Sequence, residues 1–318
     1  MIGRLIPVTA LLACLFLAPF LTACREADSR PRTIGHVMDN EAILRVLFHP
    51  TRCAKTPAPE NAVNIDIPVE DESGAVVTLA CRLFTHSPAA PTLIFFHGNG
   101  EIILDYDDIA PQYLAQRLNF AVCEYRGYGW SGGAPLVSAF LPDAEAVFVY
   151  LADWLQRNEY TGPLVLMGRS LGSACAIDLA ARHQDTVRGL VIESGFAETL
   201  PLAKALGLDL EALGIGEEQG FNNAKKIAAF RKPTLILHGQ FDQLIPIWQA
   251  EKLHAECGAR TKELQIVPGA DHNSLIPTAG PLYFAAIRAF VEKAAGTAPD
   301  WRARRRAFRA RQAGETQT

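Results

Sequence analysis

Short, uninterrupted apolar runs, each followed by an amphipathic stretch, constrain the fold of this chain more than any other feature. Runs of this length are typical of strands buried on both faces of a parallel sheet, and the amphipathic stretches are typical of the helices that join such strands. The expected strands are Thr92–Phe96, Ala121–Tyr125, Leu164–Met167, Gly189–Glu193, Thr234–His238 and Glu263–Val267. The pattern predicts an α/β protein with helices on both faces of a mostly parallel sheet.

The remaining segments complete this architecture. The expected helices are Asn40–Phe48, Ile109–Arg117, Ala139–Arg157, Ser170–Arg182, Ile247–Glu256 and Leu282–Ala294. Ahead of the first parallel strand, Val63–Pro68 and Val76–Phe84 flank a turn and are rich in β-branched residues, which predicts an antiparallel hairpin. Residues 196–232 lack the alternation and predict a small helical cap. We expect one domain over residues 37–296, and a chain that is 49% hydrophobic can supply its core.

The pentapeptide Gly168-Arg169-Ser170-Leu171-Gly172 lies between an expected strand and an expected helix. Flanking glycines allow a serine to occupy a tight strand-to-helix turn with its hydroxyl exposed. The N-terminal amides of the helix would favour negative charge developing nearby. The pattern alone also suits an ordinary Gly/Ser turn, so its interpretation depends on the rest of the chain.

A serine hydroxyl is a weak nucleophile that needs a base, and the base needs a third group to fix its tautomer. His272 follows the last expected strand, and Asp242 follows the strand before it. Loops at the carboxyl ends of parallel strands converge on one crevice. We therefore expect Ser170, Asp242 and His272 to form a catalytic triad, with Glu193 as the rival acid.

Three other titratable residues lie near these positions in the sequence. Asp271 adjoins the expected base and is interpreted as a loop residue. His97 is expected to shape the loop after the first parallel strand, and His238 is expected to be structural.

The chain order Ser170, Asp242, His272 resembles that of the α/β-hydrolase superfamily. The resemblance covers about residues 45–294 and includes the loop Phe96–Gly100, which reads FHGNG. In that family the residue after His-Gly and the residue after the nucleophile donate backbone N–H groups to the oxyanion. The resemblance therefore implies an oxyanion hole at Asn99 and Leu171, where each donor typically stabilises the transition state by about 3 to 4 kcal/mol.

The chain is most similar to compact ABHD-type esterases and to the serine aminopeptidase group of that superfamily. The resemblance implies a serine hydrolase that cleaves an ester or thioester through an acyl-serine intermediate. A serine peptidase of the same fold is the alternative, and a non-catalytic surface-binding lipoprotein is a third.

The N-terminus predicts export. Arg4 precedes the apolar stretch Leu5–Leu21, as in a secretory signal peptide. Cys24 follows Leu-Thr-Ala, which resembles the bacterial lipoprotein pattern in which this cysteine is lipidated and becomes the first mature residue. We expect a signal peptide over residues 1–23 and a tether over 24–36; an ordinary signal peptide or an uncleaved anchor is the alternative. Because Arg25 follows the cysteine, the expected location is the outer membrane, facing the periplasm.

Five cysteines remain in the expected mature domain. Cys123 and Cys175 are expected to be buried free thiols, and Cys257 has no assigned role. Cys53 and Cys81 could form a disulfide in an oxidising compartment, but sequence does not determine the pairing.

Residues 297–318 form a basic tail, and the last 18 residues carry a net charge of +5 within a chain of net charge −4. With Trp301 and Phe308, this tail could rest on anionic lipid headgroups; a solvated terminus is the alternative.

The sequence contains no Walker motif, no dinucleotide-binding fingerprint and no cysteine or histidine clusters with metal-ligand spacing. We expect no cofactor and no metal. The expected partners are a small-molecule or lipid acyl substrate and, through Cys24, a membrane, but not nucleic acid.

Overall fold

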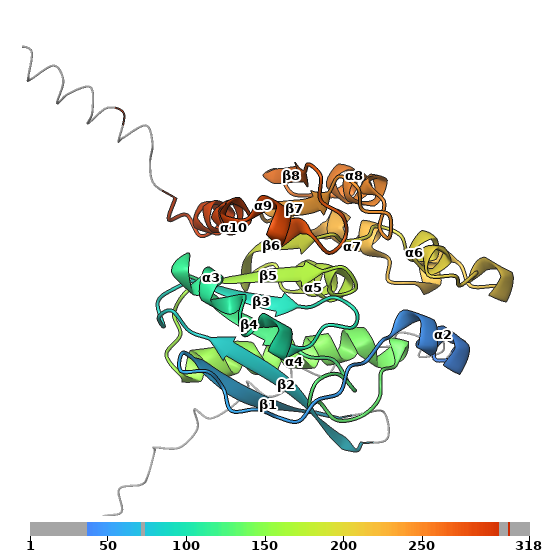
Figure 1. The fold of residues 1–318 in the computed structure, drawn as a ribbon, viewed down its shortest axis with the longest axis horizontal. Helices are drawn as coiled ribbons and strands as arrows, with labels where there is room; N and C mark the ends of the chain where they lie inside the picture. The colour runs from blue at the N-terminus through green and yellow to red at the C-terminus, as the bar shows by residue number, and fades with distance from the viewer. Residues whose placement is uncertain (1–36, 71–73, 299–304, 306–318) are drawn as a thin grey trace, which may run out of the picture. The chain divides into compact units, whose positions relative to one another are not determined.

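The computed structural model of the chain describes residues 37–70, 74–298 and 305. Its centre is an eight-stranded sheet with the strand order β1-β2-β4-β3-β5-β6-β7-β8 (Figure 1). β2 pairs antiparallel with β1 and with β4, and every other pairing is parallel. The strands are β1 Ala62–Glu70, β2 Val76–Phe84, β3 Thr92–Phe96, β4 Asn119–Cys123, β5 Leu164–Arg169, β6 Val187–Glu193, β7 Thr234–Gly239 and β8 Lys262–Val267. The predicted parallel sheet with an N-terminal hairpin is confirmed.

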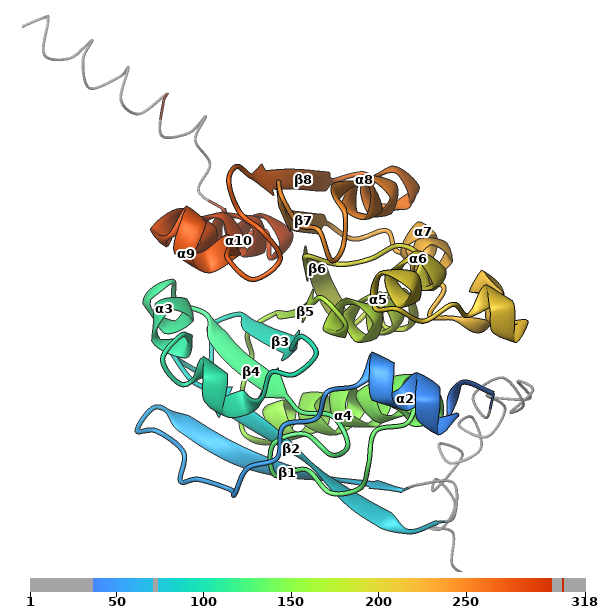
Figure 2. The ribbon, with the colours of Figure 1, turned by 45° about the vertical axis from the view of Figure 1, so that its right-hand side comes forward.

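Helices cover both faces of the sheet (Figure 2). They are α2 Glu41–Leu47, α3 Ala110–Ala115, α4 Val137–Arg157, α5 Gly172–Arg182, α6 Thr199–Ala205, α7 Asn223–Ala229, α8 Ile247–Glu256, α9 Leu275–Ala279 and α10 Pro281–Ala294. The core on one face includes side chains of α4, α5, α7 and α8, whereas the core on the other includes side chains of α3, α9 and α10. This two-sided burial explains why the central strands read as continuous apolar runs.

The strand expected at Ala121–Tyr125 is shifted and runs from Asn119 to Cys123. Asn119 is polar but fully buried. Its side-chain oxygen accepts hydrogen bonds from the backbone amides of His86 and Ser87 at 2.7 and 3.1 Å, so its polar group is satisfied inside the protein. An apolar run cannot reveal a strand residue that is satisfied in this way. The helix α9 and the 3₁₀ turns Ile103–Tyr106, Glu211–Leu213 and Glu217–Gln219 were also not anticipated.

The segment 196–232, expected to be a cap, divides into two parts. α6 and the turns Glu211–Leu213 and Glu217–Gln219 make up the first part. α7 contacts α5 and α8, and Lys226 on α7 pairs with Asp178 on α5 at 2.7 Å. α7 therefore belongs to the helical layer on the sheet. The cap consists of residues 199–219.

All five cysteines of the domain are free in the structure, and four of them are buried. The Cys81 thiol lies 3.8 Å from the thiol of Cys123, its direct partner across β2 and β4. Cys81 therefore contacts Cys123 in the sheet.

Several expectations lie outside the described residues. These are the signal peptide, Cys24, the tether and, apart from residues 297, 298 and 305, the basic tail. Within the described ranges, no helix is long and apolar enough to cross a membrane.

Phe120 on β4 is the centre of the aromatic core beneath α3. Its ring stacks on Tyr113 at a centroid distance of 4.1 Å and meets Phe95 at 5.2 Å. The side chain is completely buried. Removing it would leave a cavity that the surrounding rings cannot fill.

We expect Phe120→Ala to lower the free energy of unfolding by about 3 to 5 kcal/mol, measured by urea denaturation. The matched control is Phe241→Ala, because Phe241 is 59% exposed and should change stability by less than about 0.5 kcal/mol. Equal losses in the two variants would contradict this description of the core.

Candidate active site

Ser170 occupies a tight turn between β5 and α5. Its φ angle is +50°, in the left-handed region that non-glycine residues seldom adopt. The backbone packs closely here: a Cβ atom on Gly172 would collide with the carbonyl group of Phe96, and one on Gly168 would collide with the carbonyl group of Gly172. The backbone amide of Ser170 donates to the carbonyl oxygen of Glu193 at 2.9 Å. The strained turn is therefore held by both neighbouring strands.

The structure brings Ser170, His272 and Asp242 together. His272 Nε2 lies 2.9 Å from Ser170 Oγ, and His272 Nδ1 lies 2.7 Å from Asp242 Oδ2. With Nδ1–H donating to the carboxylate, Nε2 is left to accept the serine proton. The other Asp242 oxygen accepts backbone hydrogen bonds from Leu244 and Ile245 at 3.1 and 2.8 Å. All three side chains belong to buried residues, so the set has the geometry of a nucleophile, a base and an orienting acid.

The rival acid, Glu193, contacts Tyr283 and Arg169. One of its carboxylate oxygens accepts a hydrogen bond from the Tyr283 hydroxyl at 2.6 Å, and the other lies 3.3 Å from Nε of Arg169. Burial raises the pKa of this carboxyl, against the opposing effects of Arg169 and Tyr283. Asp271, the other carboxylate near the base, accepts hydrogen bonds within its own loop from Asn273 and Ser274.

The two amides expected to bind an oxyanion belong to Asn99 and Leu171. Within the part of the chain that the structure describes, neither backbone N–H donates a hydrogen bond. The Asn99 side chain ties its loop to the end of α2, since its amide donates to Leu47 O at 3.0 Å and its oxygen accepts from His49 N at 2.8 Å. Tyr128 adds a hydrogen bond to the same oxygen at 2.6 Å. These long-range contacts have no signal in the sequence.

His97 supports the loop that contains Asn99. Its Nδ1 lies 2.8 Å from the carbonyl oxygen of Gly98, and its Nε2 lies 3.0 Å from Glu124 Oε2. Burial works to lower the pKa of the imidazole, but the Glu124 carboxylate prevails and raises it. The second oxygen of Glu124 accepts from Ile103 N at 2.6 Å, and its backbone amide donates to Ala80 O at 2.9 Å, so Glu124 links His97 and Ile103 to β2 of the sheet.

His238 lies beneath the loop that carries the acid. The residue is buried, and Nε2 lies 2.7 Å from the carbonyl oxygen of Ile245 and 3.5 Å from Asp242 Oδ2. Burial lowers the pKa of this imidazole, despite the opposing effects of Ile245 and Asp242. A neutral His238 therefore supports the Asp242 loop.

The lowered pKa of His238 predicts a pH-dependent contribution to stability. Unfolded histidine takes up a proton near pH 6.5 whereas folded His238 does not, so stability falls as the pH drops from about 6.5 towards the folded pKa. The slope from one such group is at most about 1.4 kcal/mol per pH unit. We expect His238→Gln, which can still donate to Ile245 O, to lose less stability than wild type between pH 7.5 and 5.5. Urea denaturation at both values measures this, and parallel losses would contradict it.

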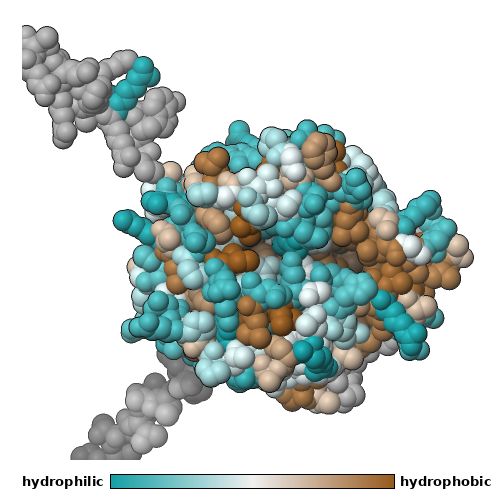
Figure 3. All heavy atoms as spheres, viewed as in Figure 1, coloured by the Kyte–Doolittle hydropathy of each residue, from teal (hydrophilic) through white to brown (hydrophobic). Residues whose placement is uncertain are grey.

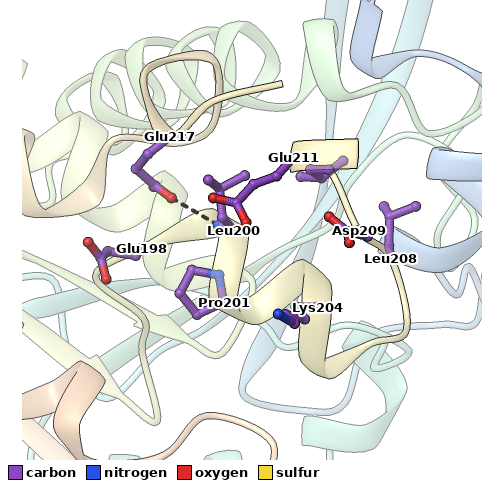
Figure 4. Close-up of a pocket in the computed structure, with 9 residues that line it drawn as sticks. Glu198, Leu200, Pro201, Lys204, Leu208, Asp209, Glu211 and Glu217 are labelled. Carbon is purple, nitrogen blue, oxygen red and sulfur yellow. Dashed lines mark hydrogen bonds between the residues drawn. The ribbon is translucent and has the colours of Figure 1, made fainter. Parts of the chain in front are cut away.

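The cap contains a concavity with an empty volume of about 740 Å³. Figure 4 shows four carboxylate residues around it, Glu198, Asp209, Glu211 and Glu217, together with Lys204. Glu217 is occupied in holding α6, because it accepts the backbone amides of Thr199 and Leu200 at 2.7 and 2.9 Å. Apolar side chains also gather over this side of the domain (Figure 3).

No group of three or more His, Cys, Asp or Glu residues in the described ranges could hold a metal ion.

Comparisons with known proteins show similarity to hydrolases in sequence and in fold. The family profile for serine aminopeptidase S33 matches residues 87–209, which include the Asn99 loop and the Ser170 turn. The alpha/beta hydrolase domain-containing protein WAV2 of Arabidopsis thaliana is 27% identical over 255 residues, covering 75% of this chain and 82% of that protein. Protein bem46 of Schizosaccharomyces pombe is 29% identical over 215 residues, covering 66% and 70%.

A solved structure shows the same fold. The Pyrococcus furiosus esterase superimposes with a TM-score of 0.61 at 18% identity, covering 77% of this chain and 98% of that one. The protein thus has the α/β-hydrolase fold, and its sequence is similar to those of alpha/beta hydrolase domain proteins.

Proposed function

We propose that this protein is a serine hydrolase that cleaves an ester or thioester through an acyl-Ser170 intermediate. The observation that carries the proposal is the hydrogen-bonded chain from Ser170 Oγ through His272 to Asp242, with distances of 2.9 and 2.7 Å. A serine hydroxyl needs such a base and such an orienting acid in order to attack a carbonyl carbon. The similarity to hydrolases supports the same reaction class.

In the proposed reaction, Ser170 Oγ attacks the acyl carbon as His272 Nε2 takes its proton. The backbone amides of Asn99 and Leu171 would receive the oxyanion, and their freedom from other partners in the described chain supports this role. His272 then gives the proton to the departing alcohol or thiol. Water releases the acyl group by the reverse sequence, with His272 again acting as the base. Asp242 holds the imidazole tautomer throughout.

An acyl substrate is favoured by the apolar side chains that gather around the cap side of the domain (Figure 3). Serine aminopeptidase activity is the second candidate, and a specific observation favours it: carboxylates line the cap concavity (Figure 4). A substrate α-ammonium group would be attracted to carboxylates. A non-catalytic binding role is the third and weakest candidate.

We also propose that the protein is exported and anchored through a lipid on Cys24, in the outer membrane facing the periplasm. The apolar stretch Leu5–Leu21 and the Leu-Thr-Ala-Cys sequence support this. The six arginines after Trp301 would add attraction to an anionic membrane surface.

We expect a fluorophosphonate probe to label the wild-type protein and not Ser170→Ala. Asp242→Asn should lower kcat for a p-nitrophenyl ester by about 10³- to 10⁴-fold, because the wrong tautomer of the base is then favoured. Glu193→Gln is the matched control, and its kcat should fall by less than about tenfold. Labelling of Ser170→Ala, or equal losses in the two carboxylate variants, would contradict these roles.

A comparison of substrates separates the two enzymatic candidates. We expect turnover of p-nitrophenyl acyl esters to exceed that of aminoacyl-anilides by a wide margin, measured as kcat/KM. A preference for aminoacyl-anilides that requires a free α-amino group would favour the peptidase instead.

We expect Cys24→Ala to abolish incorporation of an alkyne-bearing fatty acid when the full chain is expressed in bacteria, as read out by in-gel fluorescence. Ser170→Ala serves as the control and should be labelled like wild type. Undiminished labelling of Cys24→Ala would refute lipidation at this residue.

A further inference from the structure

We infer that Arg169 is a positioning residue. It ties two loops, the one that contains His272 and the one that contains Asn99 (the oxyanion loop), to the end of β5, which Ser170 follows. The inference rests on the proposed hydrolase function and concerns the same site. Arg169 is the last residue of β5 and immediately precedes Ser170. Its side chain is only 12% exposed, so its charge is held almost entirely by protein groups.

The first tie runs to the loop of the base. Arg169 donates from one terminal nitrogen to the backbone carbonyl of His272 at 3.0 Å. The same nitrogen contacts Asn273 Oδ1 at 2.9 Å. Arg169 thus holds the main chain of His272. Because Arg169 immediately precedes Ser170, this contact links the proposed base to the residue whose hydroxyl it must reach.

The second tie runs to the oxyanion loop. The other terminal nitrogen of Arg169 is paired with Glu101 Oε1. Glu101 Oε2 accepts the backbone N–H of Gly98 at 2.6 Å and the hydroxyl of Tyr106 at 2.7 Å. Because Gly98 directly precedes Asn99, the carboxylate sets the backbone next to the proposed oxyanion amide.

The third tie explains why an arginine suits this position. Nε of Arg169 lies 3.3 Å from Glu193 Oε1, and the main-chain carbonyl of Glu193 accepts the amide of Ser170. A single planar guanidinium thereby contacts two loops and the end of β6. An ammonium group has no comparable fixed fork of donors.

The electrostatics of the cluster agree with this geometry. Burial works to raise the pKa of Glu101, but Arg169 and Tyr106 lower it overall. The pKa of Glu193 is raised by burial despite the same arginine. The Glu101 carboxylate is therefore the principal counter-charge of Arg169.

A cavity with an empty volume of about 590 Å³ lies against this cluster, and its lining includes Glu101, Arg169, Glu193 and Asn273. Apolar side chains from the α9 region, among them Leu275 and Ile276, form another part of the wall. Truncating Arg169 would join the space of its side chain to this cavity, so a small cation could enter and replace the missing group.

Chemical rescue tests the inference. We expect Arg169→Ala to lower kcat for a p-nitrophenyl ester by about 10²-fold with KM changed less than about threefold, because misplaced catalytic groups affect the transition state more than substrate binding. Guanidinium at non-denaturing concentration should restore kcat at least about tenfold, whereas methylammonium should not. Arg169→Lys should lose less activity than Arg169→Ala.

Arg188→Ala is the matched control, because Arg188 is exposed on β6 and should leave kcat unchanged with or without guanidinium. If Arg169→Ala does not fold, Glu101→Gln replaces it; this variant keeps its size and should lower kcat about tenfold at constant KM.

The outcomes separate the inference from the function on which it rests. Wild-type kcat in Arg169→Ala, or a loss that neither guanidinium nor lysine relieves, would overturn the positioning role while Ser170→Ala stayed inactive. For Glu101→Gln, wild-type kcat would overturn it in the same way. Full activity in Ser170→Ala would instead overturn the proposed function.

Discussion

The close approach of α5 to β5 at Gly168 and to the end of β3 at Gly172 is the constraint on which the site depends. Neither glycine can carry a Cβ atom without colliding with main-chain carbonyl groups. The turn between them forces Ser170 into a left-handed conformation and presents its hydroxyl to His272 at 2.9 Å. The neighbouring strands hold this strained backbone in place, so the geometry of one hydroxyl depends on the packing of the whole sheet.

Buried polar groups then fix the loops around that hydroxyl. His97 and Glu124 support the loop that contains Asn99, and His238 contacts the loop that follows Asp242. Arg169 contacts both the Asn99 loop, through Glu101, and the main chain of His272. Burying such groups costs desolvation energy, and a protein in which apolar residues replace a buried ion pair is often just as stable. Their value here therefore lies in the unique arrangement of the loops that their directional hydrogen bonds impose.

Most of the architecture was predictable because buried parallel strands have a simple apolar pattern. The strands β3, β5, β6, β7 and β8 each contain the whole expected range and extend it by at most two residues at either end. β4 is shifted by two residues at both ends, and it begins earlier than expected because the buried polar side chain of Asn119 is satisfied by hydrogen bonds. α7 was assigned to the cap because its contacts with α5 and α8 are long-range and leave no local signal.

By itself, the sequence determined which functional groups are available and the order in which they lie at strand ends: Ser170, Asp242 and His272. It favoured Asp242 as the acid but left Glu193 as a rival, because both are carboxylates that follow or end parallel strands. Only the tertiary structure shows the partners of the two carboxylates: Glu193 contacts Arg169 and Tyr283, whereas Asp242 contacts His272. The physical reason is that strand position brings residues to the same edge, whereas the direction of each side chain depends on partners distant in the sequence.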